Sequence, residues 1–310
     1  LTMGKICIAK FGGSQTPQIE DISDRLAYKE IIAKISRLSL GNKQLFLVFS
    51  APGKMTSEIQ NLLDENEKLC VKTTFYRIWI NIILHKKAVI LEWFPEEKLS
   101  RFFTTELEHH WEKYKKAFLN MEERGFSCWR NGALVLGEMF QLVIMKTFLR
   151  KFNISYLSPV DQMGCFDQIF VNSKKKLRLS KSFAQIQKWY KDEIDPEGRA
   201  VVLIPGFAAM GPGGPSNLGL EGSDLTALVY ADVLARKLAG QNNVRVLFYK
   251  AVEDSTIPLS LKIYPDTLFG RDIKKPLLGG EASKYMRSHM SPDSKIYVQF
   301  RGGAPRRLHL

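Results

Sequence analysis

The chain has 310 residues, and its 45 Lys and Arg against 32 Asp and Glu give a formal net charge of +13. Hydrophobic residues make up 45% and charged residues 25%, a globular composition that excludes an extensively disordered chain, a collagen and a coiled coil. The length suits one large domain or two modest ones, and the basic excess points to nucleic acid, a membrane surface or an anionic small ligand as partner.

Strand and helix patterns alternate from the start of the chain. An apolar run at residues 6–9 breaks into a glycine turn and predicts a buried strand, and residues 21–38 carry apolar side chains at helical spacing. A second buried strand is predicted at 45–49, followed by small residues and a helix over 57–69. This order is typical of proteins in which strands and helices alternate around a parallel sheet.

The middle of the chain is predicted to be mainly helical. Residues 72–126 are rich in Lys, Glu and aromatic side chains, and 133–152 form a long apolar helix. Short strands are predicted at 155–157 and 169–171. The long apolar stretch 75–94 contains an arginine, a histidine and two lysines, so we expect an amphipathic helix there rather than a membrane span.

The last third repeats the alternating pattern, with a buried strand at 200–204, a helix over 224–239 and a strand at 245–249. We therefore predict an α/β fold with a mainly parallel sheet, in which ligands bind at the carboxyl ends of the strands. Residues 271–310 hold nine Lys and Arg against three Asp and Glu, a net of +6. A solvated basic surface explains this stretch better than RNA binding, so nucleic acid is the less favoured partner.

The four cysteines are too far apart in sequence to suggest a shared site; they are Cys7, Cys70, Cys128 and Cys165. Reduced core cysteines fit better than a disulfide framework or a zinc site. No charged segment followed by an apolar core opens the chain, so we expect a cytoplasmic protein without a membrane segment. The adjacent His109 and His110 lie in a charged helical segment and are predicted to face solvent rather than to bind a metal.

Three loops, each after a predicted strand, are suited to an anionic ligand. The first is Lys10-Phe11-Gly12-Gly13-Ser14, whose glycines let backbone N–H groups face an anion while the lysine adds charge. The second spans 50–56 and contains Lys54, and the third spans 205–224 and ends in Gly222-Ser223-Asp224 before a helix. Each taken alone is explained by a turn or a helix cap, but together they favour a phosphate site. None matches the P-loop pattern G-x-x-x-x-G-K-[ST].

These segments resemble motifs of the aspartate kinases, in the same order over residues 5–254. Lys10 to Ser14 is similar to the K-F-G-G-[ST] opening of that family, and Gly137-Glu138 to its G-E pair. Further similarities are Phe49-Ser50-Ala51 with Thr56 to the V-S-A loop, 218–224 to L-G-R-G-G-S-D and, weakly, 248–254 to W-[TK]-[DE]-V-D-G. The resemblance implies the amino acid kinase fold, a three-layer αβα sandwich with a mainly parallel central sheet.

The resemblance also implies a domain organisation. It predicts one catalytic domain over residues 3–310, with a substrate lobe at about 3–200 and a nucleotide lobe at about 200–310. Family members carry C-terminal ACT modules, and 56 residues follow Asp254 here, too few for a tandem pair, so feedback control through such modules is expected to be absent. The family forms oligomers, with which a homodimer is compatible.

The implied activity is transfer of the γ-phosphoryl group of ATP to the side-chain carboxylate of aspartate with Mg²⁺, the first step towards lysine, threonine and methionine. Such an acceptor is already anionic, so the site must neutralise charge rather than supply a strong base. The resemblance assigns three groups of residues: Lys10 and Asp224 as catalytic; Ser50, Thr56, Glu138 and Ser223 as substrate-binding; Gly12, Gly13, Ser14, Gly222 and Lys250 as phosphate-binding. No residue is assigned as a metal ligand. The alternative for Lys250 is a lysine at a strand end that faces solvent. The alternative for Glu138 is an acid in the first turn of a helix, stabilised by the helix dipole.

The sequence departs from the family at the acceptor loop. Leu220 stands where the family has the arginine that binds the substrate carboxylate, Glu221 replaces the next glycine, and Gln141 replaces a serine. Loss of a bidentate arginine weakens carboxylate binding, unless another basic residue such as Lys54 replaces it. Two alternatives to an aspartate kinase therefore stay open: a divergent kinase for another acidic substrate, and a catalytically weak ligand-binding protein with the same fold.

Overall fold

The computed structural model describes residues 6–309 except 13–14, 68, 122–125, 164–166, 199, 220–221, 237–242, 254–262, 266–267, 270–274, 279 and 292–293. Its centre is a six-stranded sheet with the order β10-β9-β6-β1-β2-β3. The strands are β1 (Ile6–Phe11), β2 (Gln44–Phe49), β3 (Ala200–Pro205), β6 (Val244–Glu253), β9 (Lys295–Arg301) and β10 (Arg306–Arg307). All neighbours pair in parallel except β10, which runs antiparallel to β9.

The strands β1, β2 and β3 are buried along their whole length because helices cover both faces of the sheet. Successive side chains of a strand point to opposite faces, so each strand contributes to two cores. In β1, Cys7, Ala9 and Phe11 pack into one core. Ile6 and Ile8 pack into the other core, and this alternation directs Lys10 to the same face as Ile8.

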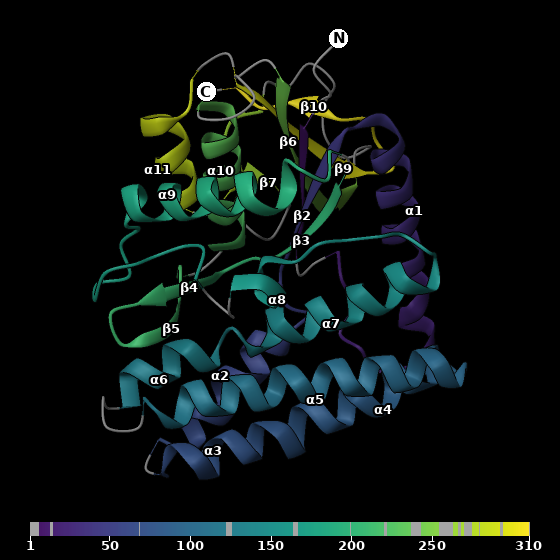
Figure 1. Cartoon of the computed structure of the whole chain (residues 1–310), viewed down its shortest axis with the longest axis vertical. Coiled ribbons are helices and arrows are strands. Elements are labelled where there is room, and N and C mark those ends of the chain that lie inside the picture. The colour runs from purple at the N-terminus through teal and green to yellow at the C-terminus, as the bar shows by residue number, and fades with distance from the viewer. Residues whose placement is uncertain are drawn as a thin grey trace.

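Figure 1 shows helices on both sides of the sheet, which makes three layers. One face carries α9 (Leu179–Trp189), α10 (Gly222–Leu234) and α11 (Gly280–His289). The other face carries α1 (Arg25–Gly41), α2 (Met55–Glu65) and α7 (Leu136–Lys151). Every residue of α10 is buried, as expected of a helix that is apolar on all sides, so its polar first turn is enclosed as well.

Further helices pack below α7, at the end of the molecule away from both chain termini (Figure 1). They are α3 (Val71–Ile78), a π-helical segment (Trp79–Ile83), α4 (Leu84–Trp93), α5 (Glu97–Leu119) and α6 (Phe126–Ala133). The short helix α8 (Pro159–Met163) lies beside α7 and contacts β3. Among the described residues, the stretch Trp129–Lys151 is long and apolar enough for a membrane span by length and composition. Of its apolar window, 94% is buried inside the fold, as in a core helix.

The predictions at 155–157 and 169–171 are wrong, because neither segment forms a strand. Leu157 and Phe170 make isolated bridges to Val202 and Met210, and both segments are too short to continue a ladder. The basic C-terminal stretch in turn contains a sheet strand that the sequence analysis missed. In β9 buried and half-buried residues alternate, so its polar side chains lie on the more open face.

Candidate active site

The parallel strands β1, β2 and β3 end at the same edge of the sheet, and the segments that follow them are packed together there. The amide of Ser50 donates to the carbonyl of Phe11 at 3.1 Å, and the amide of Gly206 donates to the carbonyl of Phe49 at 2.8 Å. Gly206 is required by this packing, since a Cβ atom at that position would lie 2.4 Å from Cβ of Ser223. The ends of β1, β2 and β3 are thereby brought against the first turn of α10.

A buried ion cluster occupies this edge. The Nζ atom of Lys10, on β1, lies 2.6 Å from Oδ1 of Asp224. The Nζ atom of Lys250, on β6, lies 3.3 Å from Oδ2 of the same carboxylate. Burial raises the pKa of Asp224, but the charges and hydrogen bonds of the two lysines outweigh it and hold that pKa below its ordinary value. Two ammonium groups thus face one carboxylate, which leaves an excess positive charge beside the positive end of the α10 dipole.

The phosphate-binding residues predicted from sequence are placed in part. Gly12 follows β1 directly, and its carbonyl accepts a hydrogen bond from the amide of Gln15 at 2.9 Å, which closes a turn. Gly13 and Ser14 lie outside the described residues. Gly222 begins α10, where a Cβ atom would lie 2.5 Å from Cβ of Leu218. The glycine therefore lets the preceding loop pass close to the amino end of the helix.

The predicted substrate residues Ser50 and Ser223 are in contact, with their hydroxyl oxygens 2.7 Å apart. They join the loop after β2 to the first turn of α10, although 173 residues separate them in sequence. Thr56 is half-buried near the start of α2, on the side towards Gly137. Lys54 is exposed just before that helix. None of the contacts described for the ion cluster involves Lys54.

Glu138 lies in the first turn of α7, with only 3% of its surface exposed. Its Oε1 accepts a hydrogen bond from the amide of Ala51 at 3.1 Å, whereas Oε2 has no hydrogen-bond partner among the described residues. Burial raises the pKa of Glu138 to about 8, against the lowering effect of the Ala51 hydrogen bond and the Lys10 charge. A buried acid with one free oxygen can bind a hydrogen-bond donor or a cation.

Gly137 explains how α7 approaches the loop after β2 so closely. A Cβ atom at that position would lie 2.6 Å from Cβ of Ala51, a distance that real Cβ atoms do not show. In the sequence, Gly137 was recognisable only as part of a motif, and neither this packing role nor the part of Ala51 was predicted. A glycine next to an acid inside an apolar helix was the available signal, because glycine is unfavourable there without a packing reason.

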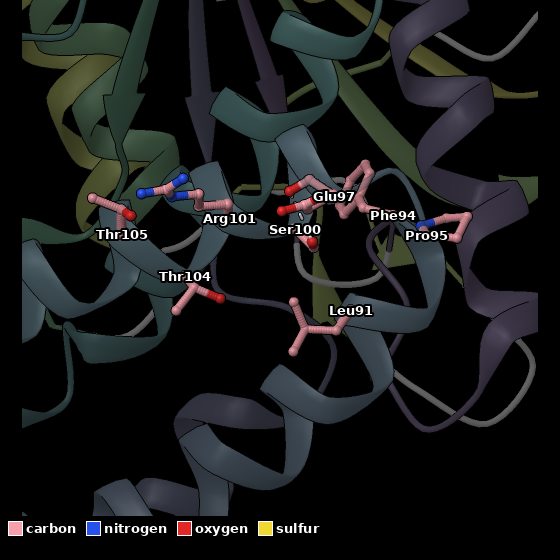
Figure 2. Close-up of a pocket in the computed structure, with 8 residues that line it drawn as sticks. All are labelled: Leu91, Phe94, Pro95, Glu97, Ser100, Arg101, Thr104 and Thr105. Atoms are coloured by element: carbon pink, nitrogen blue, oxygen red, sulfur yellow. Dashed lines mark hydrogen bonds between the residues drawn. The ribbon is translucent and has the colours of Figure 1, made fainter.

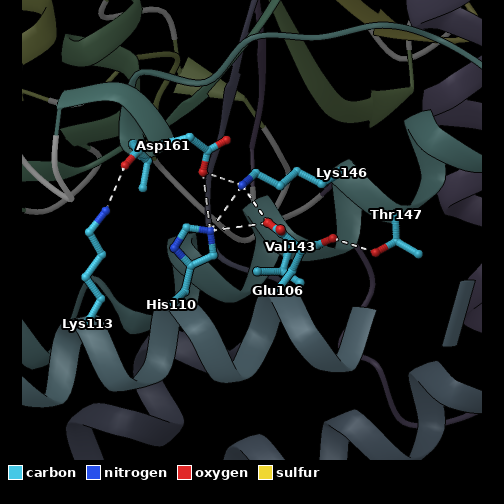
Figure 3. Close-up of polar contacts among 8 residues, drawn as sticks. Glu106, His110, Lys113, Val143, Lys146, Thr147 and Asp161 are labelled. Atoms are coloured by element: carbon cyan, nitrogen blue, oxygen red, sulfur yellow. Dashed lines mark hydrogen bonds and ion pairs between the residues drawn. The ribbon is translucent and has the colours of Figure 1, made fainter. Parts of the chain in front are cut away.

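A second group of polar side chains lies between α5, α7 and α8 (Figure 3), where His110 and Lys146 are buried, Glu106 is half-buried and Asp161 is exposed. Glu106, His110 and Asp161 are the one set of described residues with the spacing of a metal site. The ammonium of Lys146 lies at its centre, 2.8 Å from Glu106, 2.5 Å from Asp161 and 3.1 Å from His110. This lysine supplies the cation that the two carboxylates need. His110 was predicted to face solvent, which is wrong, because it is 2% exposed and forms part of this cluster.

A surface groove lies elsewhere, between the end of α4 and the start of α5 (Figure 2). It is lined by Leu91, Phe94, Pro95, Glu97, Ser100, Arg101, Thr104 and Thr105. None of these residues belongs to the predicted site, and all of them come from the helical layer rather than from strand ends. The strand edge with its buried charges therefore remains the candidate active site.

No family model matches the chain, and no curated protein is similar to it. Solved structures are similar in fold. E. coli aspartokinase III in complex with lysine and aspartate shares 16% identity with a TM-score of 0.62, over 95% of this chain and 62% of the other. Aspartate kinase from Clostridium acetobutylicum shares 16% identity with a TM-score of 0.60, over 98% of this chain and 62% of the other.

E. coli aspartokinase III in complex with aspartate and ADP shares 15% identity with a TM-score of 0.60. The similarity extends over 96% of this chain and 62% of that structure's chain. The chain thus spans about six tenths of the length of the solved structures that it matches. Identity at this level establishes the fold alone. The predicted αβα sandwich with a mainly parallel sheet, the amino acid kinase fold, is confirmed.

Proposed function

We propose that the chain is a phosphotransferase that transfers the γ-phosphoryl group of ATP to the side-chain carboxylate of aspartate. The observation that carries this proposal is the pair of buried groups at one sheet edge: the Lys10–Asp224–Lys250 cluster and the Glu138 carboxyl group. The first suits a polyphosphate and the second suits the ammonium group of an amino acid. The solved structure of E. coli aspartokinase III with aspartate and ADP has the same fold.

The transfer requires stabilisation of negative charge at each stage. A carboxylate oxygen of the acceptor forms a bond to the γ-phosphorus, and the bond from that phosphorus to the bridging oxygen of ADP breaks, with its electron pair leaving on ADP. The Lys10 ammonium stabilises the charge of the transferring group, and Lys250 that of the other phosphate oxygens. Asp224 holds both ammonium groups in place, since they would otherwise repel each other.

The acceptor is oriented by the opposite side of the site. Its ammonium group binds to the free Oε2 atom of Glu138, a charge-assisted hydrogen bond that the buried environment strengthens. The hydroxyl groups of Ser50 and Ser223, which contact each other, and that of Thr56 provide further polar partners. The amine and the reacting carboxylate are thereby held at a fixed separation, which favours reaction of one carboxylate oxygen.

Phosphate binding falls to the glycine loops. Backbone N–H groups of Gly12, Gly13, Ser14 and Gly222 are the donors that this proposal assigns to the ATP phosphates. Mg²⁺ supplies further charge neutralisation in such reactions and prefers oxygen ligands. Asp224 is the carboxylate at hand, and because both of its oxygens face lysines, phosphate oxygens would provide most of the ligands. The substrate lobe would then span residues 3–200 and the nucleotide lobe 200–310.

A second candidate acceptor is another acidic amino acid. Leu220 replaces the family arginine that binds the substrate carboxylate, and Lys54, the other basic residue considered for that role, is exposed before α2. An acceptor whose second carboxylate does not require an arginine partner would suit this loop better. This departure from the family motif is the specific observation that favours an acceptor other than aspartate.

The test is ADP release, coupled to a chromogenic reaction, with Mg²⁺-ATP and a panel of acidic amino acids and their amine-free analogues. We expect turnover with at least one amino acid and none with the Lys10→Ala variant. Tight ATP binding without turnover of any acceptor would instead favour the ligand-binding alternative. Turnover that survives Lys10→Ala would refute the proposed role of the lysine.

A further inference from the structure

The segment that follows the glycine loop of β1 contains a strained residue. Ile19 has a φ angle of +62°, in the left-handed region that β-branched residues almost never adopt. Its side chain is fully buried in the core. Such a conformation persists only where surrounding contacts hold it, and it occurs preferentially at functional sites.

The contact that holds this conformation comes from Lys86 on α4. Its ammonium group donates to the carbonyl oxygen of Gln18 at 3.0 Å. This carbonyl belongs to the peptide group that rotates about the φ angle of Ile19. The hydrogen bond therefore fixes the orientation that the strained φ angle requires, and the lysine is only 4% exposed, which strengthens the bond.

Lys86 connects the same segment to the acceptor side of the site. Its Nζ atom also lies 3.1 Å from Oε2 of Glu58, in the first turn of α2, two residues after the predicted substrate residue Thr56. One buried ammonium group thus contacts both the chain that leaves the glycine loop and the helix that follows the loop after β2. A single cation holds the two segments in a fixed relation.

The two segments also touch each other directly. The amide of Gly53 donates to the carbonyl of Thr16 at 3.2 Å, and the Thr16 hydroxyl donates to the carbonyl of Ala51 at 3.4 Å. A Cβ atom on Gly53 would lie 2.5 Å from Cα of Gln18, so the backbones are in close contact. Ala51 is the residue whose amide donates to Glu138, so a chain of contacts connects Thr16 to that carboxyl group.

We propose that Lys86 is a positioning residue. By holding the Gln18–Ile19 peptide group in its strained orientation, it fixes the spacing between the phosphate-binding loop of β1 and the acceptor-binding loop after β2. The proposal rests on the function proposed above. It requires no contact between Lys86 and either substrate, because the lysine acts through Gln18, Thr16 and Gly53.

The neighbouring Lys87 provides a matched control. It lies on the same helix and also pairs with a glutamate, at 3.1 Å from Glu108 of α5, but the contacts described for it are all with the helical layer. The variants are Lys86→Met, Lys87→Met and the conservative Lys86→Arg. If Lys86→Met does not fold, Glu58→Gln removes the charge partner of the ammonium and should cause a smaller change in the same direction.

Two measurements on the full chain test the proposal. Hydrogen exchange of the Gly53 amide, which is bonded to Thr16, should be at least about tenfold faster in Lys86→Met and unchanged in Lys87→Met. This readout requires no catalysis, so it decides the proposal even if no acceptor is found. With an active acceptor, kcat should fall by about tenfold or more in Lys86→Met at equal folded fraction, and Lys86→Arg should recover most of it.

Three results would overturn the proposal. One is unchanged exchange of the Gly53 amide in folded Lys86→Met. Another is a variant that loses thermal stability while kcat and KM of its folded fraction stay within about twofold of those of the unmodified chain, as expected of a purely structural lysine. The third is an equal effect of Lys86→Met and Lys87→Met.

Discussion

The buried carboxyl group of Glu138 allows the sharpest test of the candidate site. Burial raises its pKa from an ordinary value of 4.5 to about 8, so the folded chain binds this proton more tightly than the unfolded chain does. Between these two pH values the unfolded carboxyl is ionised and the folded one is protonated. The free energy of unfolding must therefore fall as the pH rises from 4.5 to about 8, and it stays constant with respect to this group above that range.

The size of this effect follows from the pKa values. A difference of one pKa unit corresponds to about 1.4 kcal/mol, so the rise from 4.5 to about 8 amounts to at most about 5 kcal/mol of stability. The variant Glu138→Gln keeps an oxygen to accept the Ala51 amide and cannot ionise. We expect it to be close to the unmodified chain in stability at pH 5 and several kcal/mol more stable at pH 9, about 5 kcal/mol at most.

Urea unfolding at pH 5, 7 and 9 measures this difference. Glu112→Gln is the control, because Glu112 is an exposed glutamate paired with Lys115 at 3.2 Å, and its substitution should change stability by less than about 1 kcal/mol at every pH. Parallel pH dependence of Glu138→Gln and the unmodified chain would refute the reasoning, because it would mean that Glu138 titrates alike in the folded and unfolded states.

Under the proposed function, the same group links acceptor binding to proton release. An ammonium group can pair with Glu138 only when the carboxyl is ionised, so at pH 7 binding of an amino acid must expel a proton. Calorimetry in two buffers of different ionisation enthalpy counts that proton. Glu138→Gln should release none and should bind the acceptor about 10- to 100-fold more weakly, because a charge-assisted hydrogen bond is lost. Equal proton release by both proteins would exclude Glu138 as its source.

Three further substitutions test other parts of the structure. Lys10→Ala should lower kcat by about 1,000-fold or more without loss of helical circular dichroism, and retained turnover would remove this lysine from the mechanism. Gly137→Ala should cost about 1–3 kcal/mol in urea unfolding and raise the acceptor KM, since the new methyl group would press on Ala51. Lys146→Met should cost about 1–3 kcal/mol, because it removes the buried ammonium group that bonds to two partly solvated carboxylates, whereas Lys151→Met at a surface ion pair should cost less than about 1 kcal/mol. Similar losses in the two lysine variants would contradict the central role of Lys146 in its cluster.

The strands of the sheet differ in how much the sequence reveals of them. The strands at 45–49 and 200–204 were predictable, because continuous apolar runs between turn residues mark strands buried on both faces. The strand β9 was missed, since one of its faces is more open and charged residues lie at both of its ends. Its buried positions Ile296, Val298 and Phe300 alternate with half-buried ones, a weaker pattern that the surrounding basic residues obscured.

The candidate site was predictable in its parts but not in its contacts. The glycine loop and Lys10 could be recognised from local sequence alone. The pairing of Glu138 with the amide of Ala51 joins residues 87 positions apart, and its acid–base consequence depends on burial that no local pattern encodes. His110 was placed in solvent because its neighbours on the helix are charged, whereas the deciding partner, Lys146, lies 36 residues away on another helix.

The two ends of the site hold opposite chemistry, and this restricts the acceptors that the proposed reaction can use. At the phosphate end, Lys10 and Lys250 exceed Asp224 by one charge and attract an anion. At the acceptor end, the free oxygen of Glu138 has no described partner and needs a donor. A dicarboxylate without an amine offers that oxygen no donor, so Glu138 would keep its proton and no charge-assisted hydrogen bond would form. An acceptor that carries both an amine and a carboxylate satisfies both ends, so discrimination against amine-free analogues would arise from Glu138.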